Sequence, residues 1–199
     1  MRSDWSYPAP RFGILGAWDR FVGPGATRAE QLLSAVSATL AAAGVCVHAA
    51  VAVSGWSLIE YVLAALLAFD IVGGVVTNAT ASAKRWYHRD GQGRREQLGF
   101  VALHGIHVAI VAALFLDWSI FYFAYAYGYI LVAAVATLEV PIRLQRSVAL
   151  LASVGAVFSQ LYLLMPAPGV EWFLPLLALK LLVSHLTVEE PYVAWESRP

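Results

Sequence analysis

The sequence contains few charged residues for its length. Lysine, arginine, aspartate and glutamate make up 13% of the 199 residues, whereas about 25% is typical of soluble domains. Apolar residues make up 60%, and the mean hydropathy is +0.67. A soluble domain of this size needs a largely polar surface, which this composition does not supply. The composition therefore argues against a soluble globular protein and a disordered chain, and it indicates an integral membrane protein.

Cysteine and lysine are also scarce. Cys46 is the single cysteine, which excludes an intrachain disulfide framework and a cysteine-based metal site. Lys84 and Lys180 are the two lysines, and the 13 basic residues balance 13 acidic ones. The net charge is therefore zero, and the composition gives no indication of a nucleic-acid partner. The first 30 residues contain no sustained apolar run, so we expect no cleaved signal peptide.

Long apolar runs are what the sequence does contain. A membrane-spanning helix needs about 20 mostly apolar residues. The sequence predicts an all-α bundle of about six such helices, at residues 30–53, 57–80, 98–117, 119–140, 147–166 and 170–188. A capping box, Thr27 to Glu30, marks the start of the first. We expect three parts: an interfacial or cytoplasmic arm (1–26), the transmembrane domain (27–190, with a long loop at 81–97) and a tail (191–199).

The distribution of arginine predicts the orientation of the bundle. Basic residues lie in the N-terminal arm, in the 81–97 loop and in the 141–146 turn, whereas the alternate loops have none. By the positive-inside rule, both termini lie in the cytoplasm. Arginine-rich loops without a cleavable signal fit a bacterial inner membrane.

Ionisable residues inside predicted spans are costly and are therefore functional candidates. In the second segment Asp70, Gly74 and Thr77 share a narrow face, with Asn78 beside it, and such a small-residue face predicts close packing on a neighbour. In the third segment His104 and His107 share a face. In the sixth, His185 and Glu189 are four residues apart, and Lys180 lies on another face. Polar groups on several faces predict a central position for the sixth helix.

The predicted topology brings these groups to similar depths, in the cytoplasmic half of the membrane. We therefore expect a polar pocket with Asp70, His104, His107, His185 and Glu189 as catalytic candidates. Candidates for substrate binding are the loop residues Trp86, Tyr87 and Arg89, the tyrosines of the fourth segment, and two further polar residues of the spans. This second group in full is Asn78, Trp86, Tyr87, Arg89, Tyr125, Tyr129 and Lys180.

A one-sided pocket favours an enzyme that acts on a lipid-like or isoprenoid substrate from the cytoplasmic leaflet. A metal-assisted form would use His104, His107 and His185 to hold a divalent metal such as zinc, with Asp70 or Glu189 completing the shell. A metal-free form would use carboxylate and histidine acid–base chemistry. The alternatives are a proton- or ion-coupled transporter or channel, and a haem- or quinone-binding protein. A bundle of this size is also compatible with a homo-oligomer.

Overall fold

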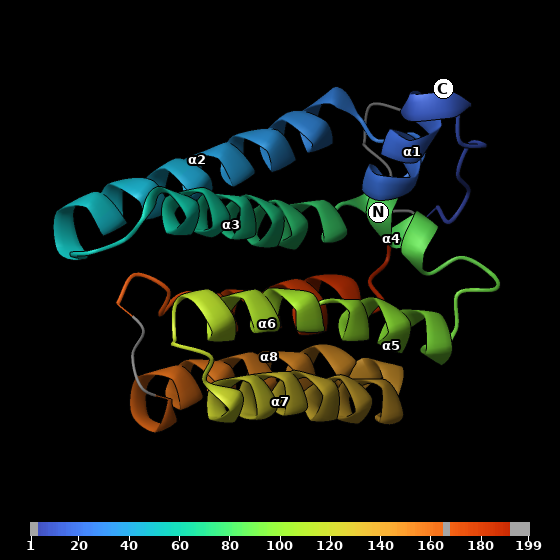
Figure 1. Cartoon of the computed structure of the whole chain (residues 1–199). Coiled ribbons are helices and arrows are strands. Elements are labelled where there is room, and N and C mark those ends of the chain that lie inside the picture. The colour runs from blue at the N-terminus through green and yellow to red at the C-terminus, as the bar shows by residue number, and fades with distance from the viewer. Residues whose placement is uncertain (1–3, 165–167, 192–199) are drawn as a thin grey trace.

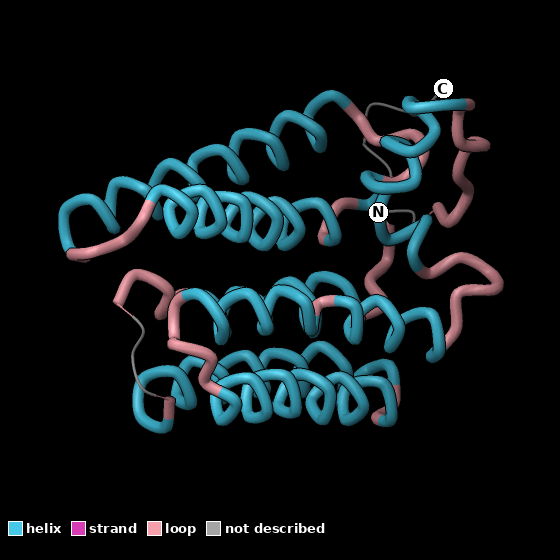
Figure 2. The backbone as a smooth tube through the Cα atoms, in the orientation of Figure 1, coloured by secondary structure: helices cyan, strands magenta, loops and turns pink. Residues whose placement is uncertain are grey.

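The computed structural model describes residues 4–164 and 168–191 (Figure 1). All regular structure in these residues is helical (Figure 2). Five helical segments are long and apolar enough to cross a membrane, which confirms the predicted all-α membrane bundle. They are α2 (Arg28–Ala52), α3 (Leu58–Asn78), α5 with α6 (Arg94–Leu103 and Gly105–Leu114), α7 (Ile120–Glu139), and α8 (Ile142–Phe158) with the π-helical η1 (Ser159–Leu163). Of the predicted tail, all but Pro191 lies outside the described residues.

The sixth predicted segment is a shorter helix than expected. It consists of α9 (Phe173–Ala178) and the π-helical η2 (Leu179–His185). At about 1.5 Å per residue it measures about 20 Å, which is less than the hydrocarbon layer of about 30 Å. It is the most enclosed helix, and six of its apolar side chains are fully buried: Phe173, Leu174, Leu177, Ala178, Leu181 and Leu182. Its central position was predicted from its polar residues, but its length was not.

The other helices surround this central one in layers (Figure 1). α3 packs against α9 and η2 on one side, and α8 packs against them on another, while α7 packs on α5, α6 and α8. α2 packs along α3 at the outside, where Gly73 lets the helices approach so closely that a Cβ there would lie 3.0 Å from Ala38 Cβ. The capping box predicted at Thr27 and Glu30 is present at the start of α2. Large apolar side chains of α2 point outward, as expected for a lipid-facing helix; they include Leu32, Leu33, Val36, Leu40, Val47 and Val51.

Both described ends of the chain lie at one end of the bundle. The backbone N–H of Asp4 donates to the carbonyl of Pro191 at 3.0 Å. Two short helices, α1 (Gly13–Val22) and α4 (Ala81–Tyr87), pack on each other at the same end (Figure 1). We call this the α1–α4 end, and the end that carries residues 53–57, 115–119 and 168–172 the opposite end.

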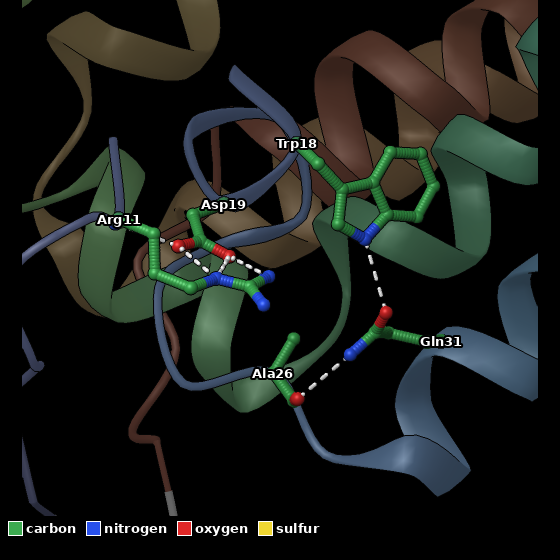
Figure 3. Close-up of polar contacts among 5 residues, drawn as sticks. All are labelled: Arg11, Trp18, Asp19, Ala26 and Gln31. Carbon is green, nitrogen blue, oxygen red and sulfur yellow. Dashed lines mark hydrogen bonds and ion pairs between the residues drawn. The ribbon is translucent and has the colours of Figure 1, made fainter. Parts of the chain in front are cut away.

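α1 has the pattern of a helix that lies in a membrane interface. Phe12, Ile14 and Leu15 are exposed, the first almost completely. On the polar side the Arg11 guanidinium binds the Asp19 carboxylate, with Nη2 to Oδ1 at 2.7 Å, and these hydrogen bonds lower the pKa of Asp19 to about 2. The Trp18 indole donates to Gln31 at 3.0 Å, which ties α1 to the first turn of α2 (Figure 3).

Gly16 makes the turn before α1 possible, and its substitution should loosen the arm. A Cβ at this position would overlap the Arg11 carbonyl oxygen, so Gly16→Ala must displace the segment that carries the Arg11–Asp19 pair. We expect faster tryptic cleavage after Arg11 and Arg20 in protein reconstituted in nanodiscs. Gly44→Ala is the matched control, because a Cβ at Gly44 meets nothing within 4 Å. Equal cleavage rates for Gly16→Ala and Gly44→Ala would show that the arm does not depend on this turn.

Candidate functional site

Asp70 of α3 lies at the centre of a charged cluster inside the bundle. Its Oδ2 accepts from Lys180 Nζ of η2 at 2.5 Å and from His107 Nε2 of α6 at 3.0 Å. The Lys180 side chain is 4% exposed and that of Asp70 is 37% exposed, so the pair is enclosed on the lysine side and reachable on the aspartate side. A charge pair among apolar helices is costly to desolvate, which makes it a candidate functional site.

Gly74 provides the space that Lys180 occupies. A Cβ at this position would overlap Lys180 Cε and lie 2.9 Å from Cδ. Because Gly74 is one helical turn after Asp70, the lysine stem crosses α3 at the glycine and its ammonium reaches the carboxylate. The small-residue face that the sequence predicts on α3 is therefore a close-packing face, and a lysine side chain packs on it.

His104 lies at the break between α5 and α6. Its backbone N–H donates to the carbonyl oxygens of Val101 and Ala102. In a continuous α-helix it would donate to the carbonyl oxygen of Phe100, four residues earlier. Its side chain replaces that bond, since Nδ1 lies 2.8 Å from the Phe100 carbonyl oxygen. A carbonyl can only accept, so Nδ1 carries the proton and Nε2 presents a lone pair. The His107 ring stacks on the His104 ring with centroids 4.8 Å apart, so both histidines share a face as predicted.

A small, partly open space lies beside this cluster, and we call it the inner cavity. Its volume is about 140 Å³, and Asp70, Gly74, Asn78, His104 and Lys180 contribute to its lining. Asn78 is 6% exposed, and its Nδ2 has no hydrogen-bond partner among the described residues. Phe21 of α1 and Tyr87 of α4 also line the cavity, so it lies toward the α1–α4 end. It therefore combines a lone-pair nitrogen, an ammonium group, an amide donor and a carboxylate.

His185 does not join this group. Its ring stacks on Phe100 at 3.9 Å between centroids, and Phe100 also contacts the His104 ring at 4.7 Å. Both ring nitrogens of His185 are buried without a partner among the described residues. The structure thus places an apolar ring against both His104 and His185, where the sequence analysis expected a shared metal site.

Glu189 is not on a helical face with His185, so that expectation is wrong. η2 ends at His185, and the Glu189 carboxylate lies 3.8 Å from Arg146 Nε at the surface. At this helix end Lys84 Nζ donates to the carbonyls of Ser184 and Thr187, each at 2.7 Å. These carbonyls receive an ammonium group in place of the N–H groups of a further turn.

Asp70, His104 and His107 could hold a metal ion. Each offers one ligand atom, and these atoms lie within 4.8 Å of one another. The bond from His104 Nδ1 to Phe100 resembles the outer-shell contact that orients metal-binding histidines. The three groups therefore fit an open three-ligand zinc site. Lys180 places a competing positive charge on the same carboxylate oxygen, so the cluster already has a cation in the described structure.

The basic 81–97 loop has a structural role that the sequence analysis did not predict. Lys84, which is 2% exposed, binds the C-terminal carbonyls of η2. His88 Nε2 donates to the His185 carbonyl at 2.9 Å, which binds the same helix end. Burial lowers the pKa of Lys84 to about 8 and that of His88 to about 4. Two side chains of this loop therefore fix the end of the central helix.

Acid should destabilise the protein through His88. Its folded-state pKa of about 4 lies below the ordinary value of 6.5, so the unfolded state takes up the proton first as the pH falls. The free energy of unfolding should therefore fall between pH 6.5 and pH 4, by about 2–3 kcal/mol from this group. Thermal unfolding in detergent across this range measures the effect. His88→Gln keeps a donor for the His185 carbonyl, and it should lose less stability on acidification than the wild type; equal losses would contradict the assignment.

The three loop residues predicted to bind substrate separate in the structure. Tyr87 lines the inner cavity, and its hydroxyl donates to the carbonyls of Arg20 and Phe21 of α1. Arg89 stacks over the Trp86 ring at 3.5 Å and donates to the Trp86 carbonyl. Trp86 also contacts Tyr7 edge-on. Trp86 and Arg89 thus form a surface pair, and Tyr87 reaches the cavity.

Tyr125 and Tyr129 connect α7 to the helix after it. The Tyr125 hydroxyl lies 2.8 Å from Ser159 Oγ, and the Tyr129 hydroxyl donates to the Ala152 carbonyl at 2.6 Å. Both hydroxyl groups therefore have hydrogen-bond partners within the bundle. These bonds are made to α8 and η1, and not to the Asp70 cluster.

Phe100 lines the inner cavity and was not predicted from the sequence. It lies four residues before His104, on the same helical face, so helical periodicity was a usable signal. Its side chain is not ionisable, and the prediction of functional residues rested on ionisable groups.

No protein-family model matches the chain, and neither the curated proteins nor the solved structures include a significant match to it. The function is therefore inferred from the site alone.

Proposed function

We propose that the protein is an integral membrane enzyme that acts on a lipid-like substrate by acid–base chemistry in the inner cavity. The observation that carries this proposal is the convergence of His104 Nε2, Lys180, Asn78 and Asp70 on the inner cavity. A base and hydrogen-bond donors that face the same small volume are what proton transfer to or from a carbonyl-type group requires.

Each group has a role in this proposal. His104 Nε2 takes a proton from water or from the substrate and returns it to the leaving oxygen or carbon. Lys180 and Asn78 donate hydrogen bonds to the substrate oxygen that gains negative charge. Asp70 holds Lys180 and His107 in place and is a positioning residue. The helix break at His104 supports this proposal, because interrupted helices within membranes border binding sites.

The test is a search for lipid conversion by purified protein. Wild-type protein in nanodiscs of bacterial polar lipids and neutral glycerolipids is compared with Lys180→Met by mass spectrometry of the extracted lipids. A new product formed by the wild type and reduced at least 100-fold in the variant is the expected result. An unchanged lipid profile for both proteins across these lipid classes would count against an enzyme.

A metal-assisted form would use Asp70, His104 and His107, where bound zinc would supply an activated water. Under the acid–base proposal, activity survives EDTA. One zinc per chain that is lost in a His104→Ala/His107→Ala double variant, together with inhibition by EDTA, would select the metal-assisted form instead.

Ion-coupled transport is the second candidate function, and the Asp70–Lys180 pair favours it because such pairs form proton relays. The apolar surroundings on the side of the opposite end weigh against it. Phe173, Leu174 and Leu177 of α9 are fully buried there. Haem binding between His104 and His185 does not fit, because the Phe100 ring contacts both imidazoles.

The topology we propose has six crossings, with the α1–α4 end in the cytoplasm of a bacterial cell. The hydrogen bond between Asp4 and Pro191 supports an even number of crossings, with α9 and η2 completing the sixth together with their flanking residues. The loops of the opposite end, at 53–57, 115–119 and 168–172, contain no lysine or arginine. Their lack of positive charge supports the orientation by the positive-inside rule.

A further inference from the structure

A second, larger hollow lies beside the inner cavity. It has a volume of about 290 Å³ and is lined by Tyr87, Gln97, Phe100 and His185, with the exposed residues Glu96 and Leu103 at its edge. We call it the outer groove. Tyr87 and Phe100 also line the inner cavity, so the two spaces are neighbours that share these two rings. Leu103 is 74% exposed on a membrane-spanning helix, which gives the groove an apolar edge toward lipid.

Two buried polar side chains in the groove have atoms without partners. His185 is 3% exposed, and neither ring nitrogen has a hydrogen-bond partner in the described chain. Gln97 is 5% exposed; its Nε2 donates to the Tyr87 carbonyl at 2.7 Å, and its Oε1 has no partner there. Buried polar atoms are normally paired, and unpaired ones indicate a missing ligand or water. Both lie at the same groove, which points to a bound molecule.

The unpaired atoms define what that molecule must offer. A neutral imidazole has one donor and one acceptor nitrogen, and Gln97 Oε1 is an acceptor. A single hydroxyl group has one proton and can donate to only one acceptor, so two nearby hydroxyl groups are needed to supply a donor to the imidazole lone pair, a donor to Gln97 Oε1 and an acceptor for the imidazole N–H. An ammonium group offers no acceptor to the imidazole N–H. A phosphate or carboxylate finds no lysine or arginine among the described lining residues, and Glu96 would repel it.

The inner cavity differs from the groove because it presents hydrogen-bond donors to a ligand. Lys180 and the unpaired Asn78 Nδ2 are donors, which suit a carbonyl or ester oxygen. A substrate that spans both spaces would therefore carry two hydroxyl groups close to an ester oxygen, and an apolar chain that leaves past Leu103.

We propose that the outer groove binds the two hydroxyl groups of a neutral ester lipid of the monoacylglycerol type, whose ester oxygen lies in the inner cavity. The groove is thus the headgroup subsite of the proposed enzyme. The inference rests on the proposed function for the role of the inner cavity, whereas binding in the groove can be measured without catalysis.

The test uses lipids that share one acyl chain and differ in headgroup. Binding of monooleoylglycerol, oleoyl lysophosphatidate and oleylamine to the purified full-length protein is measured by thermal shift and by tryptophan fluorescence in detergent, with free glycerol as the chain-free arm. Monooleoylglycerol should bind at least tenfold more tightly than the others. Equal binding of lysophosphatidate or oleylamine, or equal stabilisation by free glycerol, would overturn the inference.

Variants locate the site. His185→Phe and Gln97→Met should each weaken monooleoylglycerol binding at least tenfold. The matched control is Gln160→Met in η1, which removes another buried glutamine with unpaired amide atoms that does not line the groove. Unchanged binding in both groove variants, or equal loss in the Gln160 control, would overturn the assignment.

A catalytic variant separates this inference from the proposed function. His104→Gln should bind monooleoylglycerol with wild-type affinity. Binding by both proteins without conversion by the wild type would remove the enzymatic proposal and leave the groove assignment standing. Conversion of lipid by a wild-type protein that does not bind monooleoylglycerol would overturn the groove assignment and leave the enzyme.

Discussion

Lys180→Met should lower the free energy of unfolding by about 3 kcal/mol, because it leaves the Asp70 carboxylate without its ammonium partner inside the bundle. The Asp70 side chain is 37% exposed, which places the effect at the lower end of the range for buried pairs. Asp70→Asn should also lower the free energy of unfolding, since it leaves the buried Lys180 ammonium group without its carboxylate partner. Thermal unfolding in a single detergent gives both values.

The double variant Asp70→Asn/Lys180→Met is the decisive comparison. Removal of both charges abolishes the desolvation cost of each, so the double variant should be more stable than the sum of the single losses predicts. Strictly additive losses would mean that the pair does not interact energetically. Gly74→Ala keeps both charges. It should weaken the interaction between Asp70 and Lys180, because the new Cβ overlaps the aliphatic part of the Lys180 side chain.

His104→Gln should reduce turnover of the lipid substrate by about 10²–10⁴-fold, the usual contribution of a general base. The melting temperature should change little, because the glutamine amide can still donate to the Phe100 carbonyl. His48→Gln on the exposed side of α2 is the matched control and should retain full turnover. A His104→Gln enzyme with wild-type turnover would exclude His104 as the base.

The helices and the polar cluster could be predicted from the sequence because both follow from local rules. Hydropathy located the membrane-spanning segments, and the Thr27–Glu30 capping box located the start of α2. Helical periodicity placed His104 and His107 on one face. The predicted depths of Asp70, His104, His107, His185 and Glu189 indicated that three helices would meet at one level, but the structure brings Lys180, and not His185 or Glu189, to Asp70.

The remaining features depend on contacts between residues far apart in the chain. Lys84 reads as an ordinary loop cation, but it is buried and binds, at the end of η2, the carbonyls of Ser184 and Thr187, 100 and 103 residues away. Glu189 lies beyond this helix end and so does not share a helical face with His185. The position of Phe100 against both His104 and His185 likewise depends on how α5 packs beside η2, which no local pattern encodes.

Lipid conversion in sealed proteoliposomes, followed together with proton flux across the same vesicles, tests the central claim most directly. The account predicts that wild-type protein converts a neutral glycerolipid without proton flux, and that His104→Gln reduces this conversion at least 100-fold. Substrate-dependent proton flux with an unchanged lipid composition would contradict it, and would identify the Asp70–Lys180 cluster as part of a transport pathway.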